Sequence, residues 1–190
     1  EILDLSKIEA GKMSLEFNSV TVAEIVNDMK MLFDPIAKEK KLEFKLSIAD
    51  DVAPVLETDK MRLEQILKNL LSNALKFTAK GYVSLNISMA ADNGGIMCFK
   101  VKDTGIGIPK EKQQLIFEAF QQADGSTRRK YGGTGLGLSI SRELVRLLGG
   151  DIQINSEPGN GSEFIVMIPV TKELLLQRQS IKIGRAPVEL

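Results

Sequence analysis

The sequence predicts an α/β fold of the α+β kind, a two-layer sandwich whose mixed, mostly antiparallel sheet is covered on one face by three helices. Two hairpins support this fold. Alternating residues 81–89 and 96–102 flank the turn Asp92-Asn93-Gly94-Gly95, and residues 151–156 and 162–169 flank a second turn at 158–161. Long segments with helical periodicity begin after Thr21, at Asp59 and near Leu136. Strands paired mainly in hairpins, with helices to cover them, favour a sandwich over a doubly wound parallel sheet.

Local signals along the chain predict the remaining elements. Thr21 is expected to cap the helix that follows it, because Glu24 completes a capping-box pattern, and Pro35 is expected to kink that helix. The Asn-bearing helix should run from about Asp59 to Phe77. The other expected elements are a helix end at 1–11, a strand at 14–20, a half-buried strand at 42–48, a short strand at Val55 and Leu56, a short helix from Pro109 to about Glu118, a mobile loop at 121–133, a helix at about 136–148 and a tail or linker at 171–190.

The composition narrows the classes of function. The chain has 190 residues, no net charge and no histidine, which excludes imidazole acid–base catalysis within it and argues against a nucleic-acid-binding surface. Cys98 is the single cysteine, so a reducing compartment is expected. No apolar run approaches the roughly 20 residues of a spanning helix, and we therefore expect no membrane segment in this chain. The expected location is cytoplasmic, which leaves open a parent protein that is anchored in a membrane. Ile2, Leu5 and Ile8 have near-helical spacing, so we expect the chain to open within the last turns of a helix, as a piece of a longer protein would.

The Asn-bearing helix carries a polar stripe. Asn69, Asn73 and Lys76 are spaced i, i+4 and i+7, and they therefore share one face. An Asn carbonyl offers Mg²⁺ a hard oxygen ligand without adding negative charge beside phosphates, and a lysine neutralises phosphate charge. The alternative is an ordinary amphipathic helix with a solvated polar face.

The segment Asp103-Thr104-Gly105-Ile106-Gly107 follows a predicted strand. A carboxylate at a strand end can accept a hydrogen bond from an exocyclic amine such as that of adenine. Gly105 and Gly107 would let the backbone approach a flat ring and adopt positive φ. The alternative is a simple Asp–Gly turn that leads to the next helix.

The run Gly132-Gly133-Thr134-Gly135-Leu136-Gly137 opens a predicted helix, whose unpaired N–H groups attract phosphate. It matches neither the Walker A motif nor the Rossmann spacing. Arg128, Arg129 and Lys130 lie just upstream, where they could reach phosphates if the loop folds over them. The alternatives are a flexible loop and a solvated charge run.

Taken together, these motifs resemble the catalytic and ATP-binding domain of sensor histidine kinases, in the ATPase superfamily shared with gyrase-type and chaperone-type enzymes (the Bergerat fold). Residues 67–78 resemble the asparagine box, 103–108 the first glycine box, 116–120 the phenylalanine box and 132–140 the second glycine box. The resemblance implies a catalytic domain at 14–170 with an ATP lid at about 119–133. Residues 1–13 would end a dimerisation helix of a hybrid-type kinase, and 171–190 would be a tail or linker.

The resemblance also implies the roles of individual residues. Asn69, Asn73 and Lys76 would be catalytic, with Asn73 binding Mg²⁺, and Asp103 would receive the adenine amine. Phe77 would pack by the adenine, and Ser162 would lie near Asp103. The nucleotide contacts expected in full are Asn69, Asn73, Lys76, Phe77, Asp103, Gly105, Gly107, Ile108, Phe120, Arg128, Arg129, Tyr131, Gly133, Thr134, Gly135, Leu136, Gly137, Leu138 and Ser162.

The function expected from this resemblance is donation of the γ-phosphoryl group of Mg·ATP to a histidine outside the chain. The histidine would lie on the dimerisation domain of the same parent protein, a homodimer, and a receiver domain or response regulator would be the next partner. One rival is an ATP hydrolase of the same fold, but the superfamily's water-activating carboxylate is replaced here by Asn69. The other rival is a sensing or scaffold domain that binds ATP without transfer.

Overall fold

The computed structural model describes residues 2–91, 95–118 and 137–184, with the side chains of residues 3–180 within those ranges. Within them, the main sheet has five strands in the order β2-β4-β5-β7-β6. The β2–β4 pair is parallel, and the other neighbours are antiparallel, which confirms the mixed, mostly antiparallel sheet. The strands are β2 (Glu43–Ile48), β4 (Tyr82–Met89), β5 (Ile96–Asp103), β6 (Asp151–Ser156) and β7 (Ser162–Pro169).

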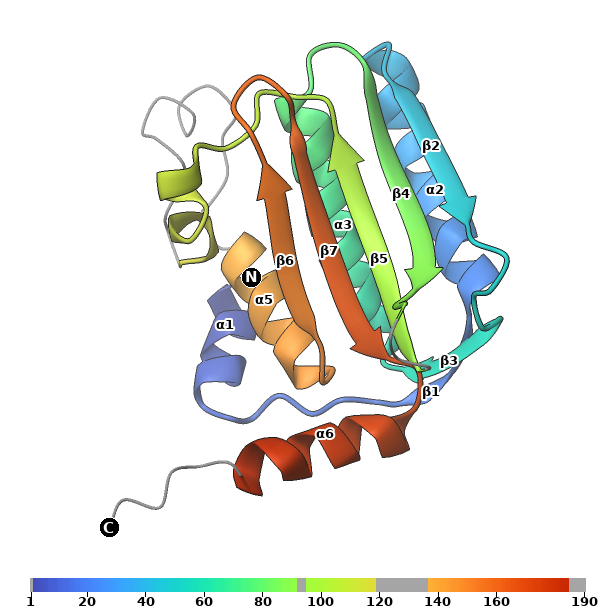
Figure 1. Ribbon diagram of the computed structural model, residues 1–190, viewed down its shortest axis with the longest axis vertical. Coiled ribbons are helices and arrows are strands. Elements are labelled where there is room, and N and C mark those ends of the chain that lie inside the picture. Colours follow the sequence, from blue (N-terminus) through green and yellow to red (C-terminus); the bar gives the residue numbers. More distant parts are fainter. Residues whose placement is uncertain (1, 92–94, 119–136, 185–190) are drawn as a thin grey trace.

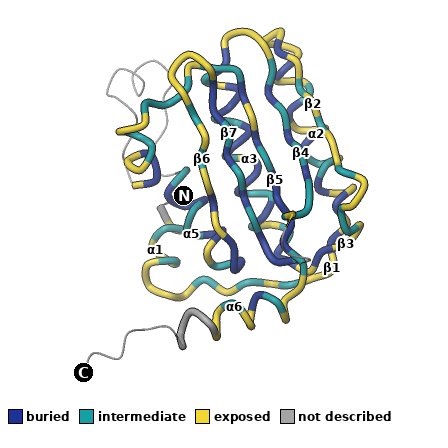
Figure 2. The backbone as a smooth tube through the Cα atoms, viewed as in Figure 1, coloured by how far each residue is buried: buried dark blue, intermediate teal, exposed yellow. Residues whose placement is uncertain are grey.

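The long helices α2 (Val22–Glu39), α3 (Lys60–Phe77) and α5 (Gly137–Leu147) form the second layer of the sandwich (Figure 1). Their apolar residues join those of the sheet in one core, and Figure 2 shows buried residues both on the central strands and on the long helices. Buried residues at i, i+4 and i+8 of α2, namely Ile25, Met29 and Phe33, show why this periodicity produces a helix on a sheet. The predicted helix-covered sandwich is therefore confirmed.

The start of α2 follows the capping prediction. The Thr21 hydroxyl accepts a hydrogen bond from the Glu24 backbone N–H at 3.2 Å. The helix continues past Pro35 to Glu39. A short second sheet holds the ends of α2 and α3 together, because β1 (Asn18–Thr21) precedes α2 and pairs with β3 (Val55–Thr58), which precedes α3.

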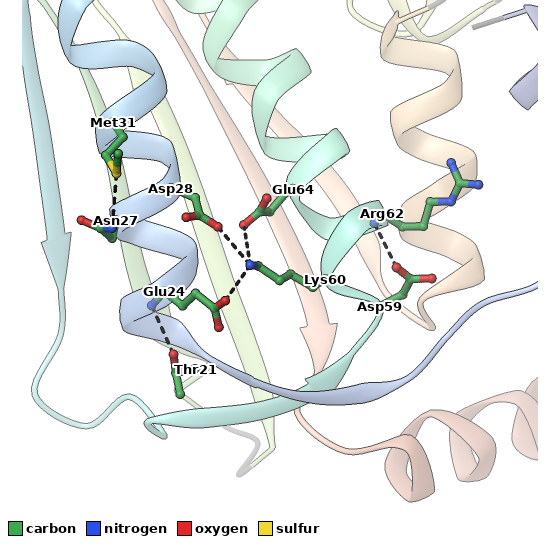
Figure 3. Close-up of polar contacts among 9 residues, drawn as sticks. All are labelled: Thr21, Glu24, Asn27, Asp28, Met31, Asp59, Lys60, Arg62 and Glu64. Carbon is green, nitrogen blue, oxygen red and sulfur yellow. Dashed lines mark hydrogen bonds and ion pairs between the residues drawn. The ribbon is translucent and has the colours of Figure 1, made fainter.

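A charged cluster links α2 to α3 near this end (Figure 3). The ammonium of Lys60 lies 2.7 Å from Glu24, 3.1 Å from Asp28 and 3.9 Å from Glu64. Asp59 caps α3 by accepting a hydrogen bond from the Arg62 backbone N–H at 3.1 Å. Helix α3, the Asn-bearing helix, is therefore fixed at its start by both a cap and a cross-helix ion pair.

Two local predictions were wrong. Residues 14–17 of the expected 14–20 strand have no ladder partner in the described structure, because Leu15 and Phe17 pack against the core without pairing, so that alternation there reflects burial alone. The expected helix from Pro109 to Glu118 is instead two 3₁₀ turns, η1 (Lys110–Lys112) and η2 (Leu115–Phe117). Its apolar anchors lie only at the second turn, where Phe117 packs edge-on to Phe164 at 6.2 Å between ring centroids.

The ends of the chain are helical. Helix α1 (Ile2–Glu9) lies beside α5, and the carboxylate of Asp4 contacts Arg62 at 3.5 Å and Gln65 at 3.1 Å on α3. Helix α6 (Lys172–Gly184) lies within the segment expected to be a tail or linker, and its Leu175 is buried against Gly149. Among the described residues, no helix is both long enough and apolar enough to cross a membrane.

Candidate functional site

Helix α3 presents its polar stripe away from the core, as the spacing predicts. Asn69 and Asn73 are half-buried and Lys76 is exposed. The opposite side of the helix is buried, and its residues are Leu63, Ile66, Leu67, Leu70, Leu71, Ala74 and Leu75. The seven apolar residues fix the rotation of α3, and the two amides and the ammonium are held in a row as a consequence.

The C-terminal end of α3 meets the loop that follows β5. The backbone N–H of Ile106 donates to the carbonyl of Phe77 at 3.3 Å. A Cβ on Gly105 would lie 2.2 Å from that same carbonyl oxygen, so the loop can pass here only as glycine. Phe77 and the 104–108 loop are therefore brought together at one end of the stripe.

Asp103 lies at the end of β5 and is buried, with 6% of its surface exposed. Its Oδ1 accepts the backbone N–H of Gly105 at 2.9 Å. Ser162 is its register partner on β7, which confirms that these two residues are neighbours. Burial raises the pKa of the Asp103 carboxyl above its usual value, and hydrogen bonds from the backbone N–H groups of Gly105 and Ser162 oppose that rise.

At the other end of the stripe, the start of α5 touches Asn69. A Cβ on Gly137 would lie 2.3 Å from the Asn69 Oδ1, so glycine allows α5 to begin directly against this amide. The Asn69 Nδ2 donates to the hydroxyl of Ser141 at 3.0 Å. The first described turn of α5 therefore lies beside Asn69, at one end of the amide stripe.

The comparisons with known proteins decide the family. Residues 58–172 match the family model described as "Histidine kinase-, DNA gyrase B-, and HSP90-like ATPase". The chain belongs to this ATPase family. The matched segment contains α3, the loop after Asp103 and the start of α5, so the family match covers the candidate site.

Relatives and solved structures place the chain among histidine kinase catalytic domains. It is 41% identical over 180 residues to hybrid signal transduction histidine kinase K of Dictyostelium discoideum, covering 90% of this chain and 15% of that protein. A crystal structure of full-length ShkA in complex with AMPPNP matches 88% of this chain and 34% of ShkA, with a TM-score of 0.79 and 34% identity. Histidine kinase ThkA in complex with response regulator protein TrrA matches 90% of this chain and 48% of ThkA, with a TM-score of 0.70 and 26% identity. The chain spans about a quarter or less of the length of the curated relatives it matches.

The glycines around Asp103 allow close contacts between two loops, and the sequence predicted only part of this role. Gly107 has a positive φ of 72°, as expected, whereas Gly105 does not have a positive φ. A Cβ on Gly107 would lie 2.0 Å from the Glu157 carbonyl oxygen, and one on Gly161 would lie 2.0 Å from the Asp103 carbonyl oxygen. The close approach in this structure is between the 104–108 loop and the β6–β7 turn. Gly107 and Gly161 therefore allow these two loops to pack together around Asp103.

Ser156 belongs to this network, although the sequence did not single it out. Its hydroxyl accepts the backbone N–H of Ile108 at 2.8 Å, donates to the Gly161 carbonyl at 2.9 Å and lies 2.8 Å from the Ser162 hydroxyl. Ile108, expected among the nucleotide contacts, is therefore held through a serine at the end of β6. A single serine at a strand end has no distinctive sequence pattern, and only its place directly before the predicted turn could have indicated a role.

A groove of about 550 Å³ adjoins the Asn69 end of the stripe. Leu32, Ile36 and Met61 on its walls are exposed by 43%, 41% and 64%. The groove is lined by Leu32, Phe33, Ile36, Met61, Gln65, Lys68, Asn69, Ser72, Gly137, Ile140 and Ser141. An apolar wall and Asn69, at one end of the stripe, therefore share one opening on the surface.

The expected site residues in the lid and near the start of α5 lie partly inside and partly outside the described residues. Leu138 lies in the first turn of α5 and is half-buried. The expected lid at 119–133 lies outside the described residues, as do Phe120, Arg128, Arg129, Tyr131, Gly133, Thr134, Gly135 and Leu136. The structure thus brings together Asn69, Gly137 and Leu138 at one end of α3, and Phe77, Asp103, Gly105, Gly107, Ile108 and Ser162 at the other, with Asn73 and Lys76 between them on the stripe.

Proposed function

We propose that this catalytic domain binds Mg·ATP along the polar stripe of α3 and donates the γ-phosphoryl group to a histidine on a helix outside this chain. One observation carries the proposal: the stripe joins the contact between Phe77 and the loop after Asp103 to the start of α5 at Asn69 and Gly137. Phe77 and Asn69 are eight positions apart on the helix, or about 12 Å along its axis. An extended nucleoside triphosphate can span a distance of this order.

The Asp103 end suits a purine that carries an amine. A charged, buried carboxylate accepts hydrogen bonds more strongly than a neutral group does, so a ligand amine within reach of Asp103 is favoured. Phe77, at the end of α3, would then provide a flat apolar contact for the ring. We assign adenine to this end for these reasons.

The Asn69 end suits phosphates and their metal ion. Mg²⁺ takes oxygen ligands and needs few of them from protein when phosphates and water supply the rest. We assign the metal contact to Asn73, with Asn69 and Lys76 beside the phosphates. Arg128 and Arg129 stay predicted phosphate contacts, and Phe120, Tyr131 and Gly133 stay predicted nucleotide contacts.

The chemistry of Asn69 favours donation over hydrolysis. An amide is not a general base, so Asn69 cannot activate a water molecule as a carboxylate would. The chain contains no histidine, so a histidine acceptor must lie on another domain or chain. Transfer would then depend on positioning and charge neutralisation, as in other phosphoryl transfers.

The groove beside Asn69 gives the acceptor a place to dock. We propose that it receives an amphipathic helix that carries the acceptor histidine, on a dimerisation domain of the same homodimeric parent protein. Three exposed apolar residues, Leu32, Ile36 and Met61, form its wall, and Asn69 and Gly137 lie at the same opening. A receiver domain or response regulator in the cytoplasm, where ATP is available, would receive the phosphoryl group next.

Phosphotransfer between separate proteins tests the function. The 190-residue chain, a dimerisation domain with its histidine and [γ-³²P]ATP are combined, and the matched control is the same domain with that histidine changed to glutamine. We expect label on the histidine domain only. Self-labelling of the chain, or release of phosphate without transfer, contradicts donation. Binding of ATP with no transfer supports the sensing or scaffold role instead.

A matched pair of methionines tests the docking groove. Met61 lines the groove and is 64% exposed, whereas Met31 is 70% exposed on α2 and is not among the groove residues. We expect Met61→Asp to slow transfer to the histidine domain at least tenfold with ATP affinity unchanged, and Met31→Asp to leave both unchanged. Equal transfer rates in the two variants would remove the groove from the proposal.

A further inference from the structure

Ser141 is a buried polar residue in the contact between α3 and α5. It is 2% exposed, and its neighbours on α5, Ile140 and Leu144, belong to the apolar core. A buried hydroxyl is costly unless it is hydrogen-bonded, and its partner here is the Asn69 amide at 3.0 Å. An alanine or valine would fill this place without that cost, so the hydroxyl calls for an explanation.

The helix α5 restrains the Asn69 amide at two points one turn apart. Gly137 places its backbone beside the amide oxygen, since a Cβ there would lie 2.3 Å from Oδ1. Ser141 accepts the amide N–H four residues later. The amide oxygen of Asn69 thus lies beside Gly137, and the amide nitrogen is bonded to Ser141. Rotation of the amide by half a turn would break the bond to Ser141 or reverse its direction.

We propose that Ser141 is a positioning residue of the nucleotide site, which holds the carbonyl oxygen of Asn69 toward the phosphate end. The inference rests on the proposed function. An asparagine amide has an accepting end and a donating end, and only the oxygen can ligate Mg²⁺ or accept a hydrogen bond from a metal-bound water. Ser141 acts by occupying the donating end, and it makes no contact with the nucleotide itself.

Two variants of nearly equal shape isolate the hydroxyl. Ser141→Thr keeps it and Ser141→Val removes it, while both add similar bulk between α3 and α5. Calorimetry with the 190-residue chain and Mg²⁺ gives the Kd for AMPPNP and for AMP. Because a net hydrogen bond is worth about 0.5–1.5 kcal/mol, we expect AMPPNP to bind about 3- to 10-fold more weakly to the valine variant than to the threonine variant. AMP, which lacks the outer phosphates, should bind both equally.

A spectroscopic measurement tests the same contact without nucleotide. The side-chain amide of Asn69 should exchange its hydrogens more slowly, by nuclear magnetic resonance, in the wild-type chain and Ser141→Thr than in Ser141→Val. If both bulky variants fail to fold, Ser141→Ala takes the place of valine and the wild type that of threonine.

The outcomes separate the two proposals. Equal AMPPNP affinities in the variants, or equal loss of AMP and AMPPNP affinity, overturn the positioning role, because a purely structural serine would act on both ligands or on neither. A wild-type chain that binds no AMPPNP overturns the proposed function, and the positioning role falls with it. Protection of the amide that is the same in all variants shows that Ser141 does not hold Asn69.

Discussion

The backbone of Gly137 lies against the side chain of Asn69 so closely that a methyl group cannot be placed between them: a Cβ would come 2.3 Å from Oδ1. The glycine that opens α5 and the first asparagine of the stripe on α3 therefore act as one unit. The two residues are far apart in the sequence, and their contact defines the end of the site where we place the phosphates.

Substitution of this glycine tests that unit. Gly137→Ala should displace either Asn69 or the start of α5 and weaken AMPPNP binding at least tenfold, while binding of AMP changes little. Alanine is favoured over glycine within a helix by about 1 kcal/mol, so general loss of stability is not expected. Calorimetry and thermal unfolding measure both effects, and full AMPPNP affinity in a folded variant would contradict the placement of the phosphates.

Asp103→Asn tests the base site. The amide keeps the volume of the carboxyl and can still accept the Gly105 N–H, but it loses the charge that strengthens a bond to a ligand amine. We expect ATP affinity to fall about 10- to 100-fold, since hydrogen bonds to charged groups are worth about 1.5–3 kcal/mol. Asp151→Asn is the matched control, because Asp151 is exposed and also accepts a backbone N–H, from Ile152 at 2.9 Å. Unchanged affinity in Asp103→Asn would remove this residue from the site.

Gly107 and Gly159 form a matched pair for the loop contact. Both have positive φ, 72° and 83°, so alanine is strained in either place by about 1–2 kcal/mol. Only the alanine at 107 would also meet a backbone atom, the Glu157 carbonyl oxygen at 2.0 Å, since nothing lies within 4 Å of a Cβ at 159. Denaturant unfolding should therefore show a larger loss for Gly107→Ala, together with weaker ATP binding. Equal losses would mean that the two loops separate easily.

The acidic pair of α2 and α3 should make stability depend on pH. Burial, and then a hydrogen bond with Asp28, raise the pKa of Glu64 from 4.5 to about 7, and the lysines Lys60 and Lys68 oppose this rise. The hydrogen bond between Glu64 and Asp28, and then the hydrogen bond between Lys60 and Asp28, lower the pKa of the Asp28 carboxyl. Between pH 4.5 and about pH 7, Glu64 of the folded chain retains a proton that Glu64 of the unfolded chain has released. The free energy of unfolding should therefore fall as pH rises through this window.

Glu64→Gln should remove that fall, because a glutamine donates its hydrogen bond at every pH. Between about pH 5 and 8 we expect the variant to gain roughly 1 kcal/mol on the wild type, less than the full pKa difference implies because the pair is partly exposed. Urea unfolding across the range measures this. Glu43→Gln is the control, since Glu43 is exposed and its ion pair with Lys45, at 3.8 Å, is solvated. Parallel pH profiles for wild type and Glu64→Gln would disprove the shared proton.

Two adjacent leucines test whether α6 is part of the folded domain. Leu175 is 5% exposed and packs over Gly149, whereas Leu176 is 51% exposed. Leu175→Ala should destabilise the chain by about 2–3 kcal/mol, because it leaves a cavity, and Leu176→Ala by less than about 0.5 kcal/mol. Thermal unfolding compares them. If both variants unfold like the wild type, α6 adds nothing to the stability of the domain.

Sequence patterns predicted the elements best where burial and periodicity coincide over a long segment. The stripe of Asn69, Asn73 and Lys76 was placed correctly because seven buried residues on the other side of α3 fix its rotation. The predictions for the short segments were wrong because burial and periodicity do not coincide there over enough residues. At 14–17 the alternation follows packing without strand pairing, and at 110–117 two short 3₁₀ turns bury only the last apolar residues.

The sequence by itself determined the class of fold, the family and the chemical types available to the site, because amides, a carboxylate, glycines and the lack of histidine can be read residue by residue. Only the tertiary structure decided which of them meet. It paired Asn69 with Gly137 and Ser141, and it brought Ser156 into the Asp103 network. Such contacts join residues separated by long stretches of chain, and they depend on packing at the scale of one methyl group, which no local pattern records.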